Sequence, residues 1–171
     1  MICRIRSARV WVVGCGNLLF GDDGFGPAVI ERLLLEYPLP EDVVAVDAGT
    51  AAGELLLDAL LGEETPETLI IIDAMNFGLE AGTVEEIPLE AIPVKKRADF
   101  SVHQFPALDI LRALKECKGV DLKLLGCQVK AIPEEICPGL SPAVASAVGE
   151  TAKAVFDMAC KEGQSVKKRV F

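Results

Sequence analysis

Aspartate and histidine side chains at a few positions are the groups of this sequence best suited to hold a metal ion or to move a proton. Carboxylate and imidazole ligands together suit a borderline divalent metal such as nickel, zinc or cadmium. Three protein ligands leave coordination positions open, as a catalytic or shared metal requires. The candidates are Asp22, Asp23, Asp47, Asp73 and His103, the last being the only histidine among the 171 residues.

Structural roles compete with a site role at most of these positions. Aspartate is a good helix cap, and we expect Asp22 to cap the helix that follows it. Asp47 either holds a turn through backbone amides or lines a pocket. Asp73 follows an apolar run, where an unpaired buried carboxylate would be costly, which favours a site role. Lone loop histidines are commonly surface residues, so the residues alone leave the role of His103 open.

The glycine-rich loop from Gly14 to Gly26 begins like a dinucleotide-binding fingerprint. Leu19 occupies the third glycine position of that pattern, where close packing of helix on strand demands a small residue. Asp22 and Asp23 follow, and their negative charges would repel a pyrophosphate at the start of the helix. The loop therefore disfavours a nucleotide and favours a cation or a basic peptide.

Alternating strands and helices must position these side chains. Three strands are apolar on both faces, which is typical of a parallel sheet covered by helices on each side. Polar positions in the fourth place it at an edge of the sheet, with an antiparallel direction as one option. The predicted strands are 10–14, 43–47, 69–73, 82–87 and 121–129, and the predicted helices are 27–37, about 50–61, 106–118 and about 142–161.

This order of elements predicts an α/β fold, a three-layer sandwich with a mixed, mostly parallel five-stranded sheet between helices. Phosphorylase/hydrolase-like and flavodoxin-like architectures both fit. We expect a single domain over residues 1–171, with 1–9 and 163–171 as candidate frayed ends. Because ligands of open parallel sheets bind beyond the carboxyl ends of the strands, we expect the site at that edge.

Composition argues against several functional classes. The formal net charge of −9 opposes binding to nucleic acid. The apolar run at 10–13 is too short for a signal peptide core or a membrane span, so we expect a cytoplasmic protein with no membrane partner. Six cysteines form no C-x-x-C pair, which indicates neither a zinc ribbon nor a disulfide framework.

Five stretches occur in order along residues 10 to about 155: Gly14-x-Gly16-Asn17-x-Leu19-x-x-Asp22-Asp23-Gly24-x-Gly26, Asp47-Ala48-Gly49-Thr50, Ile72-Asp73-Ala74, Ser101-x-His103-Gln104 and Gly139-Leu140-Ser141. In this order they resemble the hydrogenase maturation endopeptidases. Two positions depart from the pattern: Asp23 is a glutamate in some members, and Ala48 is a glycine in others. Two features, Gly-Asp-Asp-Gly-Phe-Gly and the late Gly-Leu-Ser-Pro, look most like the branch that serves deazaflavin-reducing hydrogenases of methanogens.

The resemblance implies an endopeptidase that removes a C-terminal extension from the nickel-loaded precursor of a nickel-iron hydrogenase large subunit, after a basic residue. It implies that Asp23, Asp73 and His103 are catalytic and face the metal. Nickel is expected to arrive with the precursor; the enzyme is expected to hold no metal tightly, although cadmium or zinc could occupy the site. We favour a monomer. The expected substrate pocket comprises Gly16, Asn17, Asp47, Gly49 and Thr50.

Two other functions stay open at the level of sequence. Cys15 lies in a glycine-rich loop near a helix start, which would suit a cysteine nucleophile with His103 as its base. The second alternative is a nickel-binding or metal-sensing maturation chaperone without peptidase activity, built on a flavodoxin-like scaffold.

Overall fold

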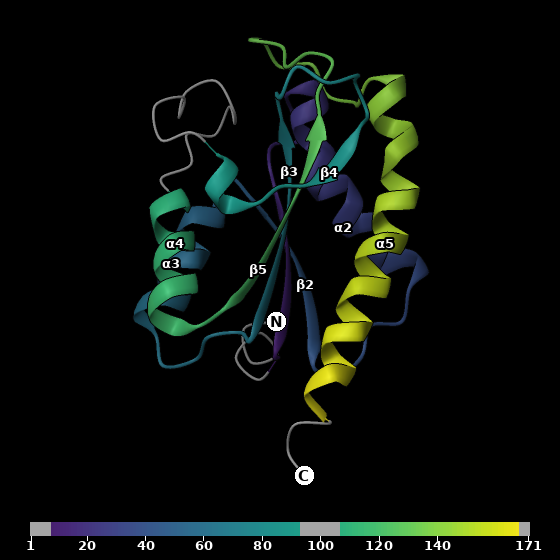
Figure 1. Cartoon of the computed structure of the whole chain (residues 1–171). Coiled ribbons are helices and arrows are strands. Elements are labelled where there is room, and N and C mark those ends of the chain that lie inside the picture. Colours follow the sequence, from purple (N-terminus) through teal and green to yellow (C-terminus); the bar gives the residue numbers. More distant parts are fainter. Residues whose placement is uncertain (1–7, 93–106, 168–171) are drawn as a thin grey trace.

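The computed structural model describes residues 8–92 and 107–167. A five-stranded sheet in the order β2-β1-β3-β5-β4 forms its centre (Figure 1). β4 runs antiparallel to β5, and the other neighbouring strands are parallel, which confirms the predicted mixed sheet with an antiparallel edge. The strands are β1 (Val10–Cys15), β2 (Val43–Gly49), β3 (Thr68–Met75), β4 (Val84–Glu86) and β5 (Asp121–Gln128).

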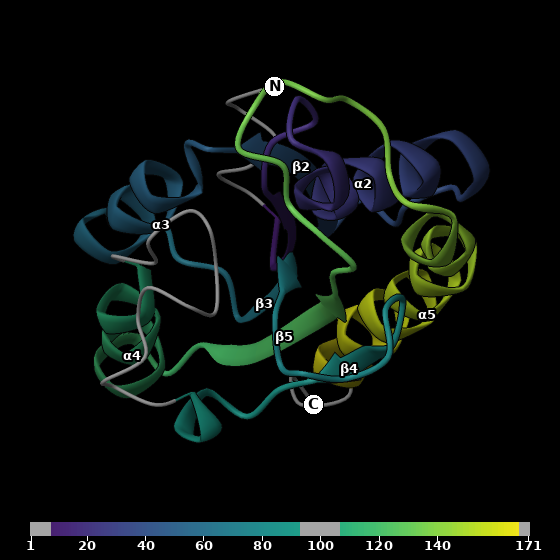
Figure 2. The same ribbon diagram turned by 90° about the horizontal axis from the view of Figure 1, so that it is seen from above.

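Helices cover both faces of this sheet. Viewed from above, α3 and α4 lie on one face, and α2 and α5 lie on the other (Figure 2). Two apolar cores fill the spaces between these three layers, as the sequence predicts. The helices are α2 (Phe25–Glu36), α3 (Ala52–Leu61), α4 (Ala107–Lys118) and α5 (Pro142–Lys167), with short 3-10 helices η1 (Gly21–Gly24) and η2 (Leu89–Ala91).

The position of each strand follows from its side chains. β1 and β3 are buried along their full length and occupy the inner part of the sheet. In β3, Ile71 packs into the core under α3 and α4, whereas Ile72 packs into the core under α2 and α5. The edge strand β4 exposes Glu85 and Glu86. The polar glutamates therefore mark β4 as an edge strand, whereas β2, at the other edge, is apolar and partly buried.

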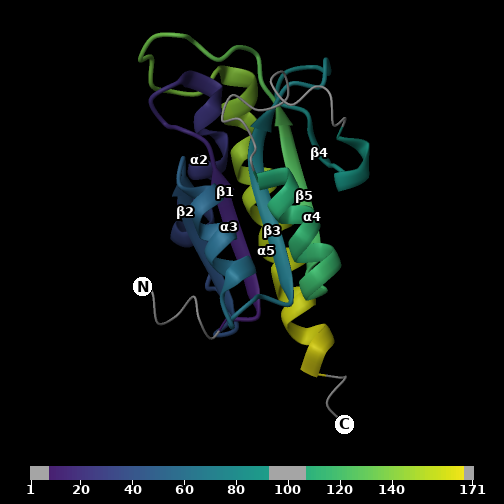
Figure 3. The same cartoon turned by 90° about the vertical axis from the view of Figure 1, so that its left-hand side faces the viewer.

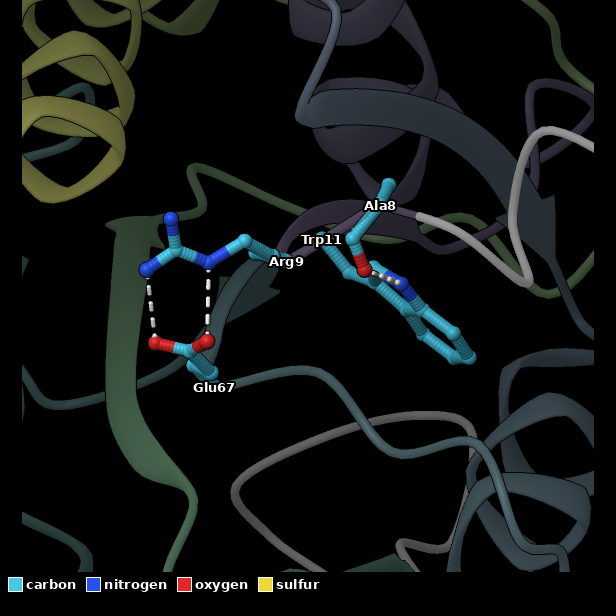
Figure 4. A network of polar contacts seen from close by, with 4 residues as sticks. All are labelled: Ala8, Arg9, Trp11 and Glu67. Atoms are coloured by element: carbon cyan, nitrogen blue, oxygen red, sulfur yellow. Dashed lines mark hydrogen bonds and ion pairs between the residues drawn. The ribbon is translucent and has the colours of Figure 1, made fainter. Parts of the chain in front are cut away.

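Polar contacts join the beginnings of β1 and β3. Arg9 donates from Nε and Nη2 to the two carboxylate oxygens of Glu67, over 2.8 and 2.9 Å (Figure 4). The indole Nε1 of Trp11 donates to the carbonyl oxygen of Ala8 over 3.1 Å. Because the ion pair is partly exposed, it contributes no more than about 1 kcal/mol. It marks the amino edge of the sheet, opposite the aspartates.

The last helix is longer than its sequence pattern predicts. α5 continues to Lys167, so residues 163–167 of the candidate frayed end are helical. Residues 1–7 and 168–171 lie outside the described part of the chain. Across residues 8–92 and 107–167, no helix combines the length and the apolar character that crossing a membrane requires.

Candidate active site

Asp23 lies in η1, the short turn between β1 and α2, with only 1% of its surface exposed. The amide of Asn17 donates to its carbonyl oxygen over 3.2 Å. Gly16 adopts a φ of +124°, and a Cβ atom there would lie 1.9 Å from the same oxygen. A glycine at position 16 thus lets the turn fold back onto the end of β1 and fixes where Asp23 sits.

The helix that follows this turn packs unusually close to the sheet. A Cβ atom on Gly26 would lie 2.2 Å from the carbonyl oxygen of Cys15 and 2.6 Å from that of Ile72. A Cβ atom on Gly14 would lie 2.7 Å from the carbonyl oxygen of Gly26. The two glycines therefore bring the start of α2 against β1 and β3, so that the preceding turn lies over the carboxyl ends of both strands.

Asp73 reaches the same edge from β3, and 2% of its surface is exposed. Its Oδ1 accepts a hydrogen bond from the amide of Ala74 over 2.9 Å. Gly14 pairs with Ile72 across β1 and β3, so the next residue of β1, Cys15, runs beside Asp73. Since side chains alternate along a strand, Asp73 shares the face of Ile71, which is the face covered by α3 and α4.

Strand register places Asp47 beside Gly14 and Asp73 beside Cys15, so both residues lie near the carboxyl end of β1. Burial raises the pKa of the Cys15 thiol well above its ordinary value of 9.0, and the negative charges of Asp73, Asp47 and Asp23 raise it further. Two carboxylates near the ends of β2 and β3 and one in the turn after β1 thus lie within electrostatic reach of this thiol. A thiol that is buried and held protonated is a poor nucleophile, so the structure contradicts the hypothesis that Cys15 attacks the substrate.

The residues of the expected substrate pocket lie at the neighbouring ends of β1 and β2. The amide of Gly16 donates to the carbonyl oxygen of Gly49 over 3.3 Å. The exposed Asp47 accepts at Oδ1 from the amide of Gly49 over 3.0 Å, which is the turn role considered for it. Asn17 likewise closes a turn, because its Oδ1 accepts from the amide of Leu19 over 3.0 Å. Thr50 is exposed beside them, and contact of this group with a substrate stays a prediction.

Asp22 does not cap a helix, and that prediction is wrong. Gly24 occupies the N-cap position of α2, and no side chain bonds there. The carboxylate of Asp22, 1% exposed, instead accepts from the amides of Lys130, Ala131 and Ser141 over 2.8, 3.3 and 2.6 Å. The hydroxyl of Ser141 donates to it over 3.0 Å. These partners lie more than a hundred positions along the chain, so no local pattern reveals them.

Gln128 organises the loop after β3, and its role is absent from the sequence prediction. Its Oε1 accepts from the amides of Phe77 and Leu79 over 2.7 and 3.2 Å. Its Nε2 donates to Oδ1 of Asn76 over 3.2 Å and to the carbonyl oxygen of Val129 over 2.8 Å. The signal in the sequence was a polar residue directly after the run Leu124–Cys127; in the structure Gln128 is 5% exposed.

His103 lies outside the described residues. The described ends of the chain around it, Ile92 and Leu108, are buried in the core under α3 and α4, on the face that Asp73 shares. Within the described ranges, no group of three or more histidine, cysteine, aspartate or glutamate side chains is arranged to hold a metal ion. Two members of the expected trio, Asp23 and Asp73, are therefore placed at one edge, and the role of His103 stays a prediction.

Comparisons with known proteins agree with this arrangement. The family model described as "HycI: Hydrogenase maturation protease" matches residues 27–158. A putative hydrogenase maturation protease of Methanocaldococcus jannaschii is 40% identical over 153 residues, which cover 89% of this chain and 97% of the relative. The coenzyme F420 hydrogenase subunit delta of Methanothermobacter thermautotrophicus is 33% identical over 155 residues, which cover 88% and 94%.

Solved structures give the same result. The hydrogenase maturating endopeptidase HybD from Escherichia coli superposes with a TM-score of 0.71 at 29% identity, covering 91% of this chain and 94% of that one. The [NiFe] hydrogenase maturation protease HycI from Thermococcus kodakarensis superposes with a TM-score of 0.68 at 25% identity, covering 89% and 92%. These neighbours favour an endopeptidase over a metal-binding chaperone. The chain belongs to the hydrogenase maturation protease family.

Proposed function

We propose that this endopeptidase removes a C-terminal extension from the nickel-loaded precursor of a nickel-iron hydrogenase large subunit. The observation that carries the proposal is the placement of Asp23 and Asp73. Both carboxylates are almost fully buried; Asp23 follows β1, and Asp73 lies near the carboxyl end of β3, beside Cys15 of β1. Together with membership of the protease family, this placement supports the carboxyl edge of β1 and β3 as the proposed cleavage site for the precursor, which we call the client.

A divalent ion carried by the client suits this pair of side chains. Taking two carboxylates out of water is costly, and a cation that binds them lowers that cost. In our proposal, Asp23, Asp73 and His103 complete the coordination of the nickel that the precursor already holds. Oxygen and imidazole ligands are suitable donors for such an ion. The shared metal then holds the scissile peptide in one orientation at the site.

If the metal has to arrive with the client, cleavage depends on nickel insertion, which then acts as a checkpoint. Asp23, Asp73 and His103 would fill only part of the coordination sphere of a metal ion, so the free enzyme would hold nickel weakly. A precursor that lacks nickel would then bind without the bridge that orients its peptide. We propose that the extension is removed only after nickel insertion, in the cytoplasm.

The charge around the site favours a basic residue next to the scissile bond. The chain carries a formal net charge of −9, and Asp47 is exposed beside Gly49 at the end of β2. Opposite charge on a client steers it toward such a surface and disfavours acidic segments. We therefore propose cleavage after a lysine or arginine, in agreement with the resemblance in sequence.

For the client itself, we propose a deazaflavin-reducing, coenzyme F420-type hydrogenase. The sequence features Gly-Asp-Asp-Gly-Phe-Gly and Gly-Leu-Ser-Pro support this branch, as does the 33% identity to the coenzyme F420 hydrogenase subunit delta. Offering large-subunit precursors from an F420-type hydrogenase and from another class, in equal amounts, tests the assignment. Faster cleavage of the second precursor would overturn it.

The experiment for the proposed function weighs the products of two reactions. The purified chain is mixed with nickel-loaded precursor and, separately, with nickel-free precursor, and intact masses are measured over time. We expect loss of one C-terminal peptide from the loaded precursor and an unchanged mass for the nickel-free one. Equal cleavage of both would contradict the nickel checkpoint, and cleavage of neither would contradict the proposed activity.

A further inference from the structure

Three large apolar side chains are exposed together beside the candidate active site. We name the group Leu18, Leu19 and Ile136 the apolar patch; their exposed fractions are 53%, 48% and 69%. Two loops supply it, and backbone hydrogen bonds join them. The amide of Cys137 donates to the carbonyl oxygen of Leu19 over 2.8 Å, and the amide of Gly21 donates to that of Cys137 over 2.9 Å. The two loops that carry the patch are thus joined side by side.

A backbone bridge and the buried carboxylate of Asp22 hold the two loops of the patch in place. Phe20 forms a parallel bridge with Cys137, at the centre of the two loops. Asp22 binds the second loop near both of its ends, through Lys130 and Ser141. Since the carboxylate of Asp22 is 1% exposed, it serves the loops and not a ligand. A surface that is already ordered loses little conformational entropy when a partner binds it.

The patch adjoins the residues of the proposed reaction. Leu18 and Leu19 precede η1, the turn that carries Asp23, by only a few residues. Viewed from above, the loop after β5 passes beside the loop after β1, over the carboxyl edge of the sheet (Figure 2). A protein client that presents a peptide to Asp23 and Asp73 therefore has to cover this region. A surface leucine far from the site would carry no such requirement.

We propose that the apolar patch is the docking surface for the segment of the large-subunit precursor next to the scissile bond. This inference rests on the proposed function and names where the same client binds. Exposed apolar residues in a group mark interaction surfaces, and a few buried anchors supply most of the affinity of an interface. Glu134 and Glu135, both exposed, directly precede Ile136. The fitting segment therefore combines apolar side chains with lysine or arginine.

Direct binding measurements test the inference separately from cleavage. The dissociation constant for nickel-free precursor is measured by titration for wild type, Leu19→Ala and Ile136→Ala. The control is Leu61→Ala, because Leu61 is 77% exposed at the end of α3, on the amino side of the sheet (Figure 3). We expect Kd to rise about tenfold for each patch variant and to stay unchanged for the control. Thermal unfolding of each variant shows that the fold is intact.

One further variant tests the exposed Glu135 beside the apolar patch, and a second serves as its control. Glu135→Gln should raise Kd about threefold at low salt and less at high salt, whereas Glu63→Gln, in the exposed turn after α3, should not change it. Equal Kd values for wild type and both patch variants would overturn the docking site. A wild-type chain that fails to bind the precursor, or a patch that instead joins two copies of the enzyme in light scattering, would overturn it as well.

Failure of the docking site and failure of the proposed function give different results. If the patch variants bind more weakly and wild type does not cleave, the docking surface would be supported and the peptidase activity contradicted. If nickel-loaded precursor is cleaved normally and Kd is equal across all variants, the peptidase activity would be supported and the docking surface contradicted.

Discussion

The backbone amide of Ser141 donates a hydrogen bond to the carboxylate of Asp22 over 2.6 Å, joining segments 119 positions apart. Ser141 directly precedes α5, and Asp22 neighbours Asp23 in the turn that starts α2. The contact therefore ties the helices that cover one face of the sheet to the candidate active site. Stability and geometry of the site depend on the same carboxylate.

Replacing Asp22 with alanine should destabilise the fold strongly. Three backbone amides and one hydroxyl would lose their acceptor, and those of them that stay buried would be unsatisfied. We expect the free energy of unfolding to fall by about 3 kcal/mol, measured by urea denaturation. Asp58→Ala, on the exposed face of α3, serves as the control and should change stability by less than about 0.5 kcal/mol. A similar small change for Asp22→Ala would mean that solvent replaces its contacts.

A methyl group at Gly26 should separate α2 from the sheet. Its Cβ would lie 2.2 Å from a carbonyl oxygen of β1, and neither backbone can yield easily. We expect Gly26→Ala to lower stability by about 2 to 3 kcal/mol and to reduce precursor cleavage. A Cβ atom on Gly53 in α3 would meet no atom of the described residues within 4 Å, so Gly53→Ala should stabilise by about 0.5 to 1 kcal/mol. Thermal melts of the two variants that shift in the same direction would contradict this account of the packing.

Cys15 should resist thiol reagents in the folded protein. Burial and the charges of Asp73, Asp47 and Asp23 raise its pKa, so the reactive thiolate is scarce at pH 8. Cys117 and Cys137 are exposed and should be alkylated first. Peptide mapping by mass spectrometry after iodoacetamide treatment checks the order. Rapid modification of Cys15 without denaturant, together with loss of cleavage, would restore the nucleophile hypothesis.

Stability should decline in alkaline solution because of a second buried thiol. Burial, and then the charge of Asp22, raise the pKa of Cys127 from 9.0 to about 12. Below pH 9 the thiol is protonated in both states. Between pH 9 and about 12 the unfolded chain loses this proton first, so the free energy of unfolding falls as pH rises. Urea titrations from pH 8 to 11 should show a shallower fall for Cys127→Ala than for wild type. Parallel curves would exclude this cause.

Hydrophobic patterning predicts the strands of the fold, although it does not reveal that the apolar β2 is an edge strand. The run Leu69–Ile72 marks β3 as an inner strand, and Glu85 and Glu86 mark β4 as an edge strand. The predicted strands end within two residues of the observed ones. Helix ends are predicted less well: the sequence favours Thr50 as the start of α3, but the helix starts at Ala52 with Ala51 at the N-cap position. Intrinsic propensity indicates that a helix forms, whereas tertiary contacts determine at which residue it begins and ends.

Long-range contacts explain what the sequence leaves hidden at the site. The rule that ligands bind at the carboxyl ends of parallel strands places Asp23 and Asp73 correctly at one edge. The neighbouring Asp22 has the same chemistry and a favourable capping position, yet its partners come from the loop after β5. Only the folded backbone distinguishes these adjacent aspartates. Gln128 is hidden for the same reason, since its partners include Asn76 and Phe77, in the loop after β3.

The most direct measurement compares Asp73→Asn with wild type on nickel-loaded precursor, by the intact mass of the products. Asparagine keeps the size of the side chain and removes its charge, so the fold should persist while cleavage slows at least about 100-fold. Asp58→Asn, on exposed α3, should cleave normally. Loss of the C-terminal peptide at the wild-type rate by the Asp73→Asn variant would contradict a role for this carboxylate in the reaction.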